Sequence, residues 1–253
     1  MSPRIALVTH ALAFAGPPAV AALAAAGFRV LAHDRAFADA TARDAFVAAH
    51  PGAEASPAQD PAALVDVAWA LAGRLDVVVS NDAHAVVHAP VADADIDALR
   101  QTLEALVVFP FVLARAAIPR LRATPGSRVV MVTSNRTRLP QAGGAIPDIA
   151  RAGANALARS LAIELAPHGI PVNAIAPNFL ASETYYPRAR FVDDPAGADY
   201  VRRTVPAGRL ARPEEIGELI RFLATCESTF LTGANIDFSG GWPVGVARPS
   251  PST

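Results

Sequence analysis

The sequence contains little cysteine, few aromatic residues and no excess of charge of either sign. Its single cysteine, Cys226, cannot form an intrachain disulfide. Aromatic residues make up 6% of the 253 residues, and the formal net charge is -1. The basic residues are scattered, so the sequence offers no electrostatic footprint for nucleic acid or for an anionic membrane surface. We therefore expect no nucleic-acid or membrane partner.

A long apolar run near the amino terminus is also missing. The segment MSPRIALVTH has too few consecutive apolar residues for a signal peptide or a membrane span. Together with the lone cysteine, this predicts a cytoplasmic protein. A hydrophobic content of 52% over 253 residues suffices for one large domain with a substantial core. We expect that domain to cover residues 1–253, with an irregular tail at about 244–253, where proline and serine are frequent.

Short apolar runs alternate along the chain with longer, alanine-rich segments of helical period. This alternation is typical of repeated βαβ units and predicts a doubly wound α/β fold with a mainly parallel sheet. Strands such as LDVVVS are almost uniformly apolar, which indicates helices on both faces of the sheet. We expect strands near residues 4–9, 28–33, 75–80, 127–133, 170–175 and 234–238. Helices are expected at PPAVAALAAAG and at residues 96–121, 148–166 and 213–225.

The segments that follow the strands hold the candidate site, because ligands bind at the carboxyl ends of parallel strands. The first of them, THALAFAG, resembles a phosphate-binding turn, but His10 and Phe14 occupy positions where backbone would have to approach a pyrophosphate. The bulk of Phe14 predicts that no nicotinamide cofactor binds. Asp34 lies about 18 residues beyond Gly16, near the spacing of a ribose-binding acid. Carboxylates are also common in turns, and we favour that role.

These features resemble the short-chain dehydrogenase/reductase superfamily and, within it, the halohydrin dehalogenases. The first motif of that branch is threonine, four residues, phenylalanine, one residue and glycine, and Thr9, Phe14 and Gly16 meet it. NFLASETYYP resembles the halide-site loop of the family, and RLARPEEIGELIRFLA and FLTGANIDFSGGWP resemble its last helix and strand. The resemblance runs from the first strand to about Pro243. It implies a Rossmann-like sheet of seven strands and a homotetramer formed through residues 96–121 and 148–166.

The second motif of the branch is serine, twelve residues, tyrosine, three residues and arginine, and here the sequence departs from the family. Ser134 and Arg151 match, but Pro147 occupies the tyrosine position. In the family's chemistry the tyrosine takes a proton from a substrate hydroxyl, and the resulting alkoxide expels halide to form an epoxide. Tyrosine and arginine four residues apart share one helical face, which allows them to act together. Proline cannot exchange a proton, so we expect an impaired activity or another base.

Several residues are candidates for that other base. Asp148 reaches the pocket if the helix begins at Pro147; otherwise it is a carboxylate that interacts with the helix dipole. Arg151 then binds an anion or pairs with Asp148. Tyr185 and Tyr186 resemble the pocket-lining aromatics of the family, and either could supply a phenol, although packing in the pocket wall is favoured.

The resemblance places the halide against the loop that follows the strand IPVNAIA, namely Pro177, Asn178, Phe179 and Leu180. The alternative for this loop is an ordinary turn, since proline and asparagine are frequent turn residues. Ser134 contacts the ligand or satisfies backbone groups. His84 faces the crevice or is solvated. The residues expected in the substrate pocket are Phe14, His84, Pro147, Tyr185 and Tyr186.

Three functions are compatible with these residues. The leading one is a cofactor-independent halohydrin dehalogenase-like lyase, which takes a haloalcohol or epoxide and a halide or other small anion, and whose base is altered. The second is a non-catalytic or different-function small-molecule-binding protein on the same fold. The weakest is an NAD(P)-dependent reductase, since the chain departs from both the glycine turn and the tyrosine-lysine pair of such enzymes. We expect neither a cofactor nor a metal.

Overall fold

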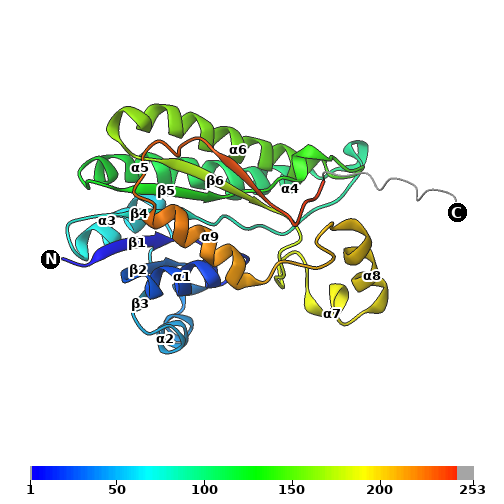
Figure 1. The fold of residues 1–253 in the computed structure, drawn as a ribbon, viewed down its shortest axis with the longest axis horizontal. Coiled ribbons are helices and arrows are strands. Elements are labelled where there is room, and N and C mark those ends of the chain that lie inside the picture. Colours follow the sequence, from blue (N-terminus) through cyan, green and yellow to red (C-terminus); the bar gives the residue numbers. More distant parts are fainter. Residues whose placement is uncertain (1, 244–253) are drawn as a thin grey trace, which may run out of the picture.

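The computed structural model describes residues 2–243 (Figure 1). The irregular tail expected at about 244–253 lies outside these residues. Seven strands form one sheet in the order β3-β2-β1-β4-β5-β6-β7, and each pair of neighbouring strands is parallel. The strands are β1 (Arg4–Val8), β2 (Phe28–His33), β3 (Ala53–Ser56), β4 (Val77–Ser80), β5 (Arg128–Val132), β6 (Val172–Pro177) and β7 (Asn235–Phe238). The expected Rossmann-like, doubly wound fold is confirmed.

Helices cover both faces of the sheet, as Figure 1 shows. They are α1 (Gly16–Ala25), α2 (Ala40–Ala49), α3 (Pro61–Ala70), α4 (Ile96–Leu103), α5 (Phe109–Arg122), α6 (Ala145–Leu165), α7 (Arg188–Phe191), α8 (Pro195–Thr204) and α9 (Pro213–Thr225). One buried core combines β-strand residues with α1 and α9, and a second combines them with α3, α5 and α6. Successive strand residues such as Ile5 and Ala6 enter opposite cores because side chains alternate along a strand.

The strand order reverses between β1 and β4, which places the crevice of the fold at the carboxyl ends of these two strands. The loop after β6 leads into α7 and α8, which lie beside this end of the sheet (Figure 1). A small apolar cluster anchors that segment through Phe179, Val201, Val205 and Trp242. The residues between β6 and α9 are thereby brought toward the crevice.

The helix α6 begins earlier than the sequence suggested. A start at Pro147 or Asp148 was expected, but the first helical residue is Ala145. Pro147 is buried in the first turn, where its missing N–H removes no helical hydrogen bond. The Asp148 amide already donates to the Gly144 carbonyl over 3.0 Å. Asp148 therefore sits in a formed turn of helix.

One helix, Ile96–Arg122, is long and apolar enough to cross a membrane by length and composition. It comprises α4, a π-helical segment at Glu104–Val108 and α5. Its inner side packs in the core through Leu113, Ala117 and Leu121. A core helix of a globular protein meets the same test, so the sequence-based expectation of no membrane partner stays a prediction.

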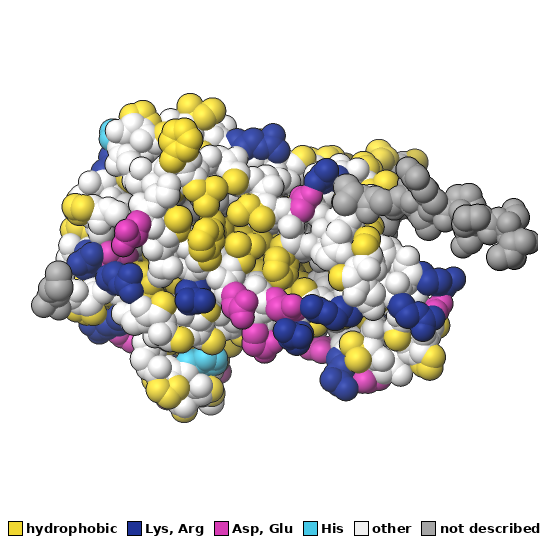
Figure 2. All heavy atoms as spheres, in the orientation of Figure 1, with side chains coloured by type: hydrophobic (Ala, Val, Ile, Leu, Met, Phe, Trp, Pro, Cys, Tyr) yellow, Lys and Arg dark blue, Asp and Glu magenta, His cyan; other side chains and the backbone are white. Residues whose placement is uncertain are grey.

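The space-filling view shows apolar side chains gathered in a band between α9 and β7 (Figure 2). Phe222 on α9 is half exposed, and Phe230, which precedes β7, is 97% exposed. Exposed apolar side chains also lie on the outer sides of α5 and α6, among them Phe111 and Ile163. Both regions are candidates for contact between subunits.

Candidate functional site

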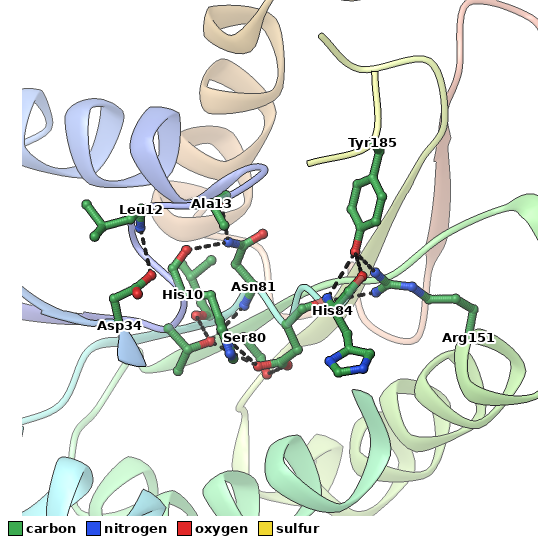
Figure 3. A network of polar contacts seen from close by, with 12 residues as sticks. His10, Leu12, Ala13, Asp34, Ser80, Asn81, His84, Arg151 and Tyr185 are labelled. Carbon is green, nitrogen blue, oxygen red and sulfur yellow. Dashed lines mark hydrogen bonds and ion pairs between the residues drawn. The ribbon is translucent and has the colours of Figure 1, made fainter. Parts of the chain in front are cut away.

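The turn between β1 and α1 is closed by hydrogen bonds within the chain (Figure 3). The Leu12 amide donates to the Asp34 carboxylate over 3.1 Å. Asn81, which follows β4, donates from its side chain to the carbonyls of His10 and Ala13 over 3.0 and 2.9 Å. Asp34 therefore helps to hold the turn, which agrees with a role as a turn carboxylate more than as a ribose-binding acid.

Other amides of the same turn are also used within the chain. The Ala11 amide donates to the His33 carbonyl over 2.8 Å, and the Ala13 amide donates to the His10 carbonyl over 3.1 Å. The Gly16 amide donates to the Ala13 carbonyl over 2.9 Å. In a dinucleotide fold the turn and the helix start offer their amides to a pyrophosphate. Here the amides of Ala11, Leu12, Ala13 and Gly16 already have acceptors.

Three residues show why the turn retains one glycine and lacks the others. His10 and Phe14 have φ angles of 48° and 55°, in the left-handed region that glycine adopts most easily. A side chain at either position stands where a ligand would have to approach the backbone of the turn. A Cβ atom on Gly16 would lie 2.3 Å from the His10 carbonyl oxygen. Gly16 is therefore required by the packing of the turn on itself.

Phe14 directs its ring toward the loop that follows β6. The ring stands edge-on to the Tyr185 ring, with centroids 4.8 Å apart and planes at 87°. This is a favourable aromatic geometry. Side chains from the turn after β1 and from the loop after β6 thus meet at the carboxyl end of the sheet.

The hydroxyl of Tyr185 joins three parts of the chain (Figure 3). It accepts a hydrogen bond from Arg151 Nη2 over 3.0 Å and one from the His84 amide over 3.2 Å. It donates to the His84 carbonyl over 3.0 Å. Arg151, on α6, also donates from Nη1 to the Asp82 carbonyl over 3.2 Å and is itself buried. A buried cation and a phenol therefore face each other at the carboxyl end of the sheet.

Ser134 lies just beyond the end of β5 and is nearly buried. Its hydroxyl donates to the Pro177 carbonyl over 3.3 Å and accepts from the Arg136 amide over 3.2 Å. The Asn155 side chain donates to the Ser134 carbonyl over 3.0 Å. Ser134 thus contacts the end of β6, where the predicted halide loop begins, and it satisfies backbone groups at the same time.

Asp148 and Arg151 both lie on α6, but they form no ion pair with each other within residues 2–243. The Asp148 carboxylate forms an ion pair with the Arg136 side chain from the segment after β5, and both groups are largely buried. The sequence left open a pairing of Arg151 with Asp148, and this pairing is wrong. Asp148 is paired with Arg136, whereas Arg151 donates hydrogen bonds to the Tyr185 hydroxyl and the Asp82 carbonyl.

The predicted halide loop has a specific backbone arrangement. Phe179 adopts φ 56°, and its amide donates to the Asn178 side chain over 3.0 Å. The amides of Asn178 and Ala181 donate to carbonyls of neighbouring segments. Leu180 is buried, and its amide has no hydrogen-bond acceptor among the described residues. A buried N–H without a partner is uncommon and is a natural donor for an anion.

Tyr186 has a different environment from its neighbour Tyr185. Its hydroxyl donates to the Asn178 side chain over 2.5 Å, and its ring packs against Phe179 and Phe191. Burial raises the pKa of the Tyr186 phenol well above its ordinary value. This phenol therefore stays protonated and serves as a donor that orders the loop.

A buried polar cluster lies beneath the first turn. Asp82 accepts hydrogen bonds from Thr9 over 3.2 Å and from Ser80, and His10 Nδ1 is 3.4 Å from its carboxylate. His33 stands edge-on to His10, with ring centroids 5.6 Å apart. Asp82 follows β4 and His33 ends β2, and no sequence motif or spacing marks either one as a site residue.

The described residues also form an open pocket of about 170 Å³ against Phe179 of the halide loop. It is lined by Phe179, Ala207, Arg209, Ala211, Glu215, Phe238, Ser239 and Gly240. Arg209 and Glu215 form a two-pronged ion pair beside it. Tyr185 and Arg151 do not line this pocket.

The structure gathers most of the predicted residues at one end of the sheet. Phe14, Tyr185, His84 and Arg151 form one connected group. Ser134 contacts the Pro177 carbonyl, at the start of the halide loop. Pro147 lies one helical turn before Arg151, and Asp148 faces Arg136.

Comparisons with known proteins place this geometry in a family. A family model described as enoyl-(acyl carrier protein) reductase matches residues 16–243. A curated relative, the cis-4-hydroxycyclohexanecarboxylate dehydrogenase of Sinomonas cyclohexanicum, is 34% identical over 94% of this chain and 96% of its own length.

Two solved structures are closely similar. A halohydrin dehalogenase bound to ethyl (2S)-oxiran-2-ylacetate is 33% identical, with a TM-score of 0.93, over 97% of this chain and all of its own. A structure described as a dehalogenation enzyme is 35% identical, with a TM-score of 0.91, over 95% of this chain and 98% of its own. The chain is thus similar in sequence to a dehydrogenase, and similar in both sequence and fold to dehalogenases.

Proposed function

Because the chain belongs to the short-chain dehydrogenase/reductase superfamily, we propose that it uses this fold as a cofactor-independent halohydrin dehalogenase-like lyase. The reaction would interconvert vicinal haloalcohols with epoxides and halide. The observation that carries the proposal is the first turn. The amides of Ala11, Leu12, Ala13 and Gly16 are bonded within the chain, and the Phe14 ring packs against Tyr185, so these donors are not available to cradle a pyrophosphate.

The anion would bind at the halide loop. The buried Leu180 amide offers a donor without an internal partner, and the neighbouring apolar side chains suit a weakly hydrated ion. Ser134 contacts the same strand end through Pro177 and would hold the substrate hydroxyl. Arg151 would stabilise negative charge as it develops on oxygen, since preorganised donors in a dry site act strongly on such charge.

An NAD(P)-dependent reductase is the second candidate, because the curated relative is a dehydrogenase. Such an enzyme needs a tyrosine and a lysine on one helix, and this sequence contains no lysine. Pro147 and Arg151 occupy the corresponding helix, α6. The resemblance to dehydrogenases therefore covers the scaffold, whereas the groups that bind and use nicotinamide are replaced.

Calorimetry with NAD⁺, NADH, NADP⁺ and NADPH separates these two candidates. We expect no binding to the purified protein, and micromolar binding of any of the four would contradict the proposal. Phe14→Gly is the matched comparison. That variant removes the ring but leaves the amides of Leu12 and Gly16 bonded within the chain, so we expect it to remain unable to bind the nucleotides.

A further inference from the structure

We propose that Tyr185 supplies the phenol that Pro147 removes from the second motif, so that the base of the reaction comes from the loop after β6 and not from α6. This assignment rests on the proposed function. Its basis is the hydrogen bond of 3.0 Å between Arg151 Nη2 and the Tyr185 hydroxyl, across 34 residues of sequence. The family motif places a phenol and a cation on one helical face. In this chain the tertiary structure brings a phenol from another segment to the same cation.

The other tyrosines lack this arrangement. The chain has three tyrosines, and all of them lie within the described residues. The Tyr186 phenol is buried against Asn178, and Tyr200 is an exposed residue of α8. Tyr185 alone among them has a hydrogen bond to an arginine.

The Tyr185 hydroxyl makes hydrogen bonds that a residue packing in the pocket wall would not need. Edge-on packing against Phe14 requires the ring only, and phenylalanine would provide it. The hydroxyl instead accepts from two N–H groups, those of Arg151 and His84, and directs its proton to the His84 carbonyl. Charge that develops on this oxygen would remain bound by two donors.

The proton transfer balances as follows. Tyr185 releases its own proton to water and enters the cycle as a phenolate, which Arg151 and the His84 amide continue to hold. The phenolate oxygen accepts the proton of the substrate hydroxyl. The alkoxide oxygen forms a bond to the adjacent carbon as the carbon–halogen bond breaks, and the halide leaves with the electron pair. The phenol then returns its proton to water, so haloalcohol yields epoxide, halide and one proton.

Tyr185→Phe tests this assignment, with Tyr200→Phe as the matched control for loss of a phenol outside the site. We expect Tyr185→Phe to lower kcat for halide release by about 10²-fold or more, with a much smaller change in KM, by the usual size of general-base effects. Tyr200→Phe should keep the native rate. Thermal unfolding of both variants checks that they are folded. Because Tyr185→Phe removes the group that accepts the proton, the residual activity should also lose the native pH dependence.

A double variant gives a second readout. In Tyr185→Phe combined with Pro147→Tyr, a phenol returns to α6 four residues before Arg151, and recovery of at least tenfold over Tyr185→Phe supports the assignment. A Tyr185→Phe rate within about threefold of native overturns it and leaves the proposed function standing. Tyr185→Ala faster than native would show that the ring only blocks the site. A native protein that releases no halide overturns the proposed function, and the assignment with it.

Discussion

His33 is a buried side chain at the end of β2, and neither of its ring nitrogens has a hydrogen-bond partner among the described residues. Burial lowers its pKa to about 4, and the neighbouring His10 acts in the same direction, whereas the carboxylates of Asp34 and Asp82 oppose it. The ring stacks on Phe109, with centroids 5.5 Å apart. The folded protein therefore holds His33 as a neutral, largely apolar group.

This residue predicts a loss of stability in acid. The folded pKa is lower than the ordinary value of 6.5, so the contribution of neutral His33 is complete above pH 6.5 and is lost as the pH falls toward 4. Each pKa unit corresponds to about 1.4 kcal/mol, so the shift from 6.5 to about 4 lowers the free energy of unfolding by on the order of 3 kcal/mol. Urea unfolding of native protein and His33→Phe from pH 7 to pH 4.5 measures it.

His33→Phe keeps an aromatic ring against Phe109 but cannot be protonated, so its stability should fall less steeply below pH 6.5. His88→Phe is the control, because His88 is exposed. Its pH profile should follow that of the native protein. Equal slopes for the native protein and His33→Phe would contradict the account of this buried histidine.

At the scale of whole elements, α5 and α6 present apolar side chains to solvent. Phe111 and Ile149 are more than half exposed, and Ile163 is 77% exposed. Covering such side chains with a second subunit stabilises the assembly by up to about 2 kcal/mol for each. The band between α9 and β7 offers a second such surface (Figure 2). Two different surfaces, each repeated by a two-fold axis, generate a tetramer.

We therefore predict a homotetramer in solution, measured by light scattering. Ile163→Glu should convert it to dimers, because the carboxylate would be buried without a partner. Val47→Glu is the matched control, since Val47 is a partly exposed apolar residue on α2, away from both surfaces. A monomeric native protein would rule out the prediction, and a tetramer in Ile163→Glu would rule out this interface.

The elements themselves differ in how well the sequence predicts them. Strands buried on both faces, such as β5, and the helix α9 are found where the apolar pattern places them. The edge strand β3 was not located, because AEAS is short, half-buried and carries a polar residue at alternate positions. The start of α6 was misplaced because Gly144 and Pro147 both resemble a helix boundary, while the first turn forms across them.

For the molecule as a whole, the sequence predicts where the site lies but not all of its contacts. The topology brings the segments after β1, β4, β5 and β6 together, so Phe14, Ser134 and Arg151 could be assigned to one crevice. The contact between Tyr185 and Arg151 spans 34 residues and depends on how the loop folds over the sheet. The choice of Arg136 over Arg151 by Asp148 is likewise a tertiary effect that spacing cannot reveal.

The central claim is that this dehydrogenase scaffold performs halide chemistry without a nucleotide. Halide release from a panel of vicinal haloalcohols, with purified protein and no added nucleotide, tests it most directly. We expect chloride or bromide to appear together with the epoxide, and azide, cyanide or nitrite to open the epoxide in the reverse direction. Failure to release halide from any haloalcohol, with NADH or NADPH oxidised on a ketone substrate instead, would contradict the account.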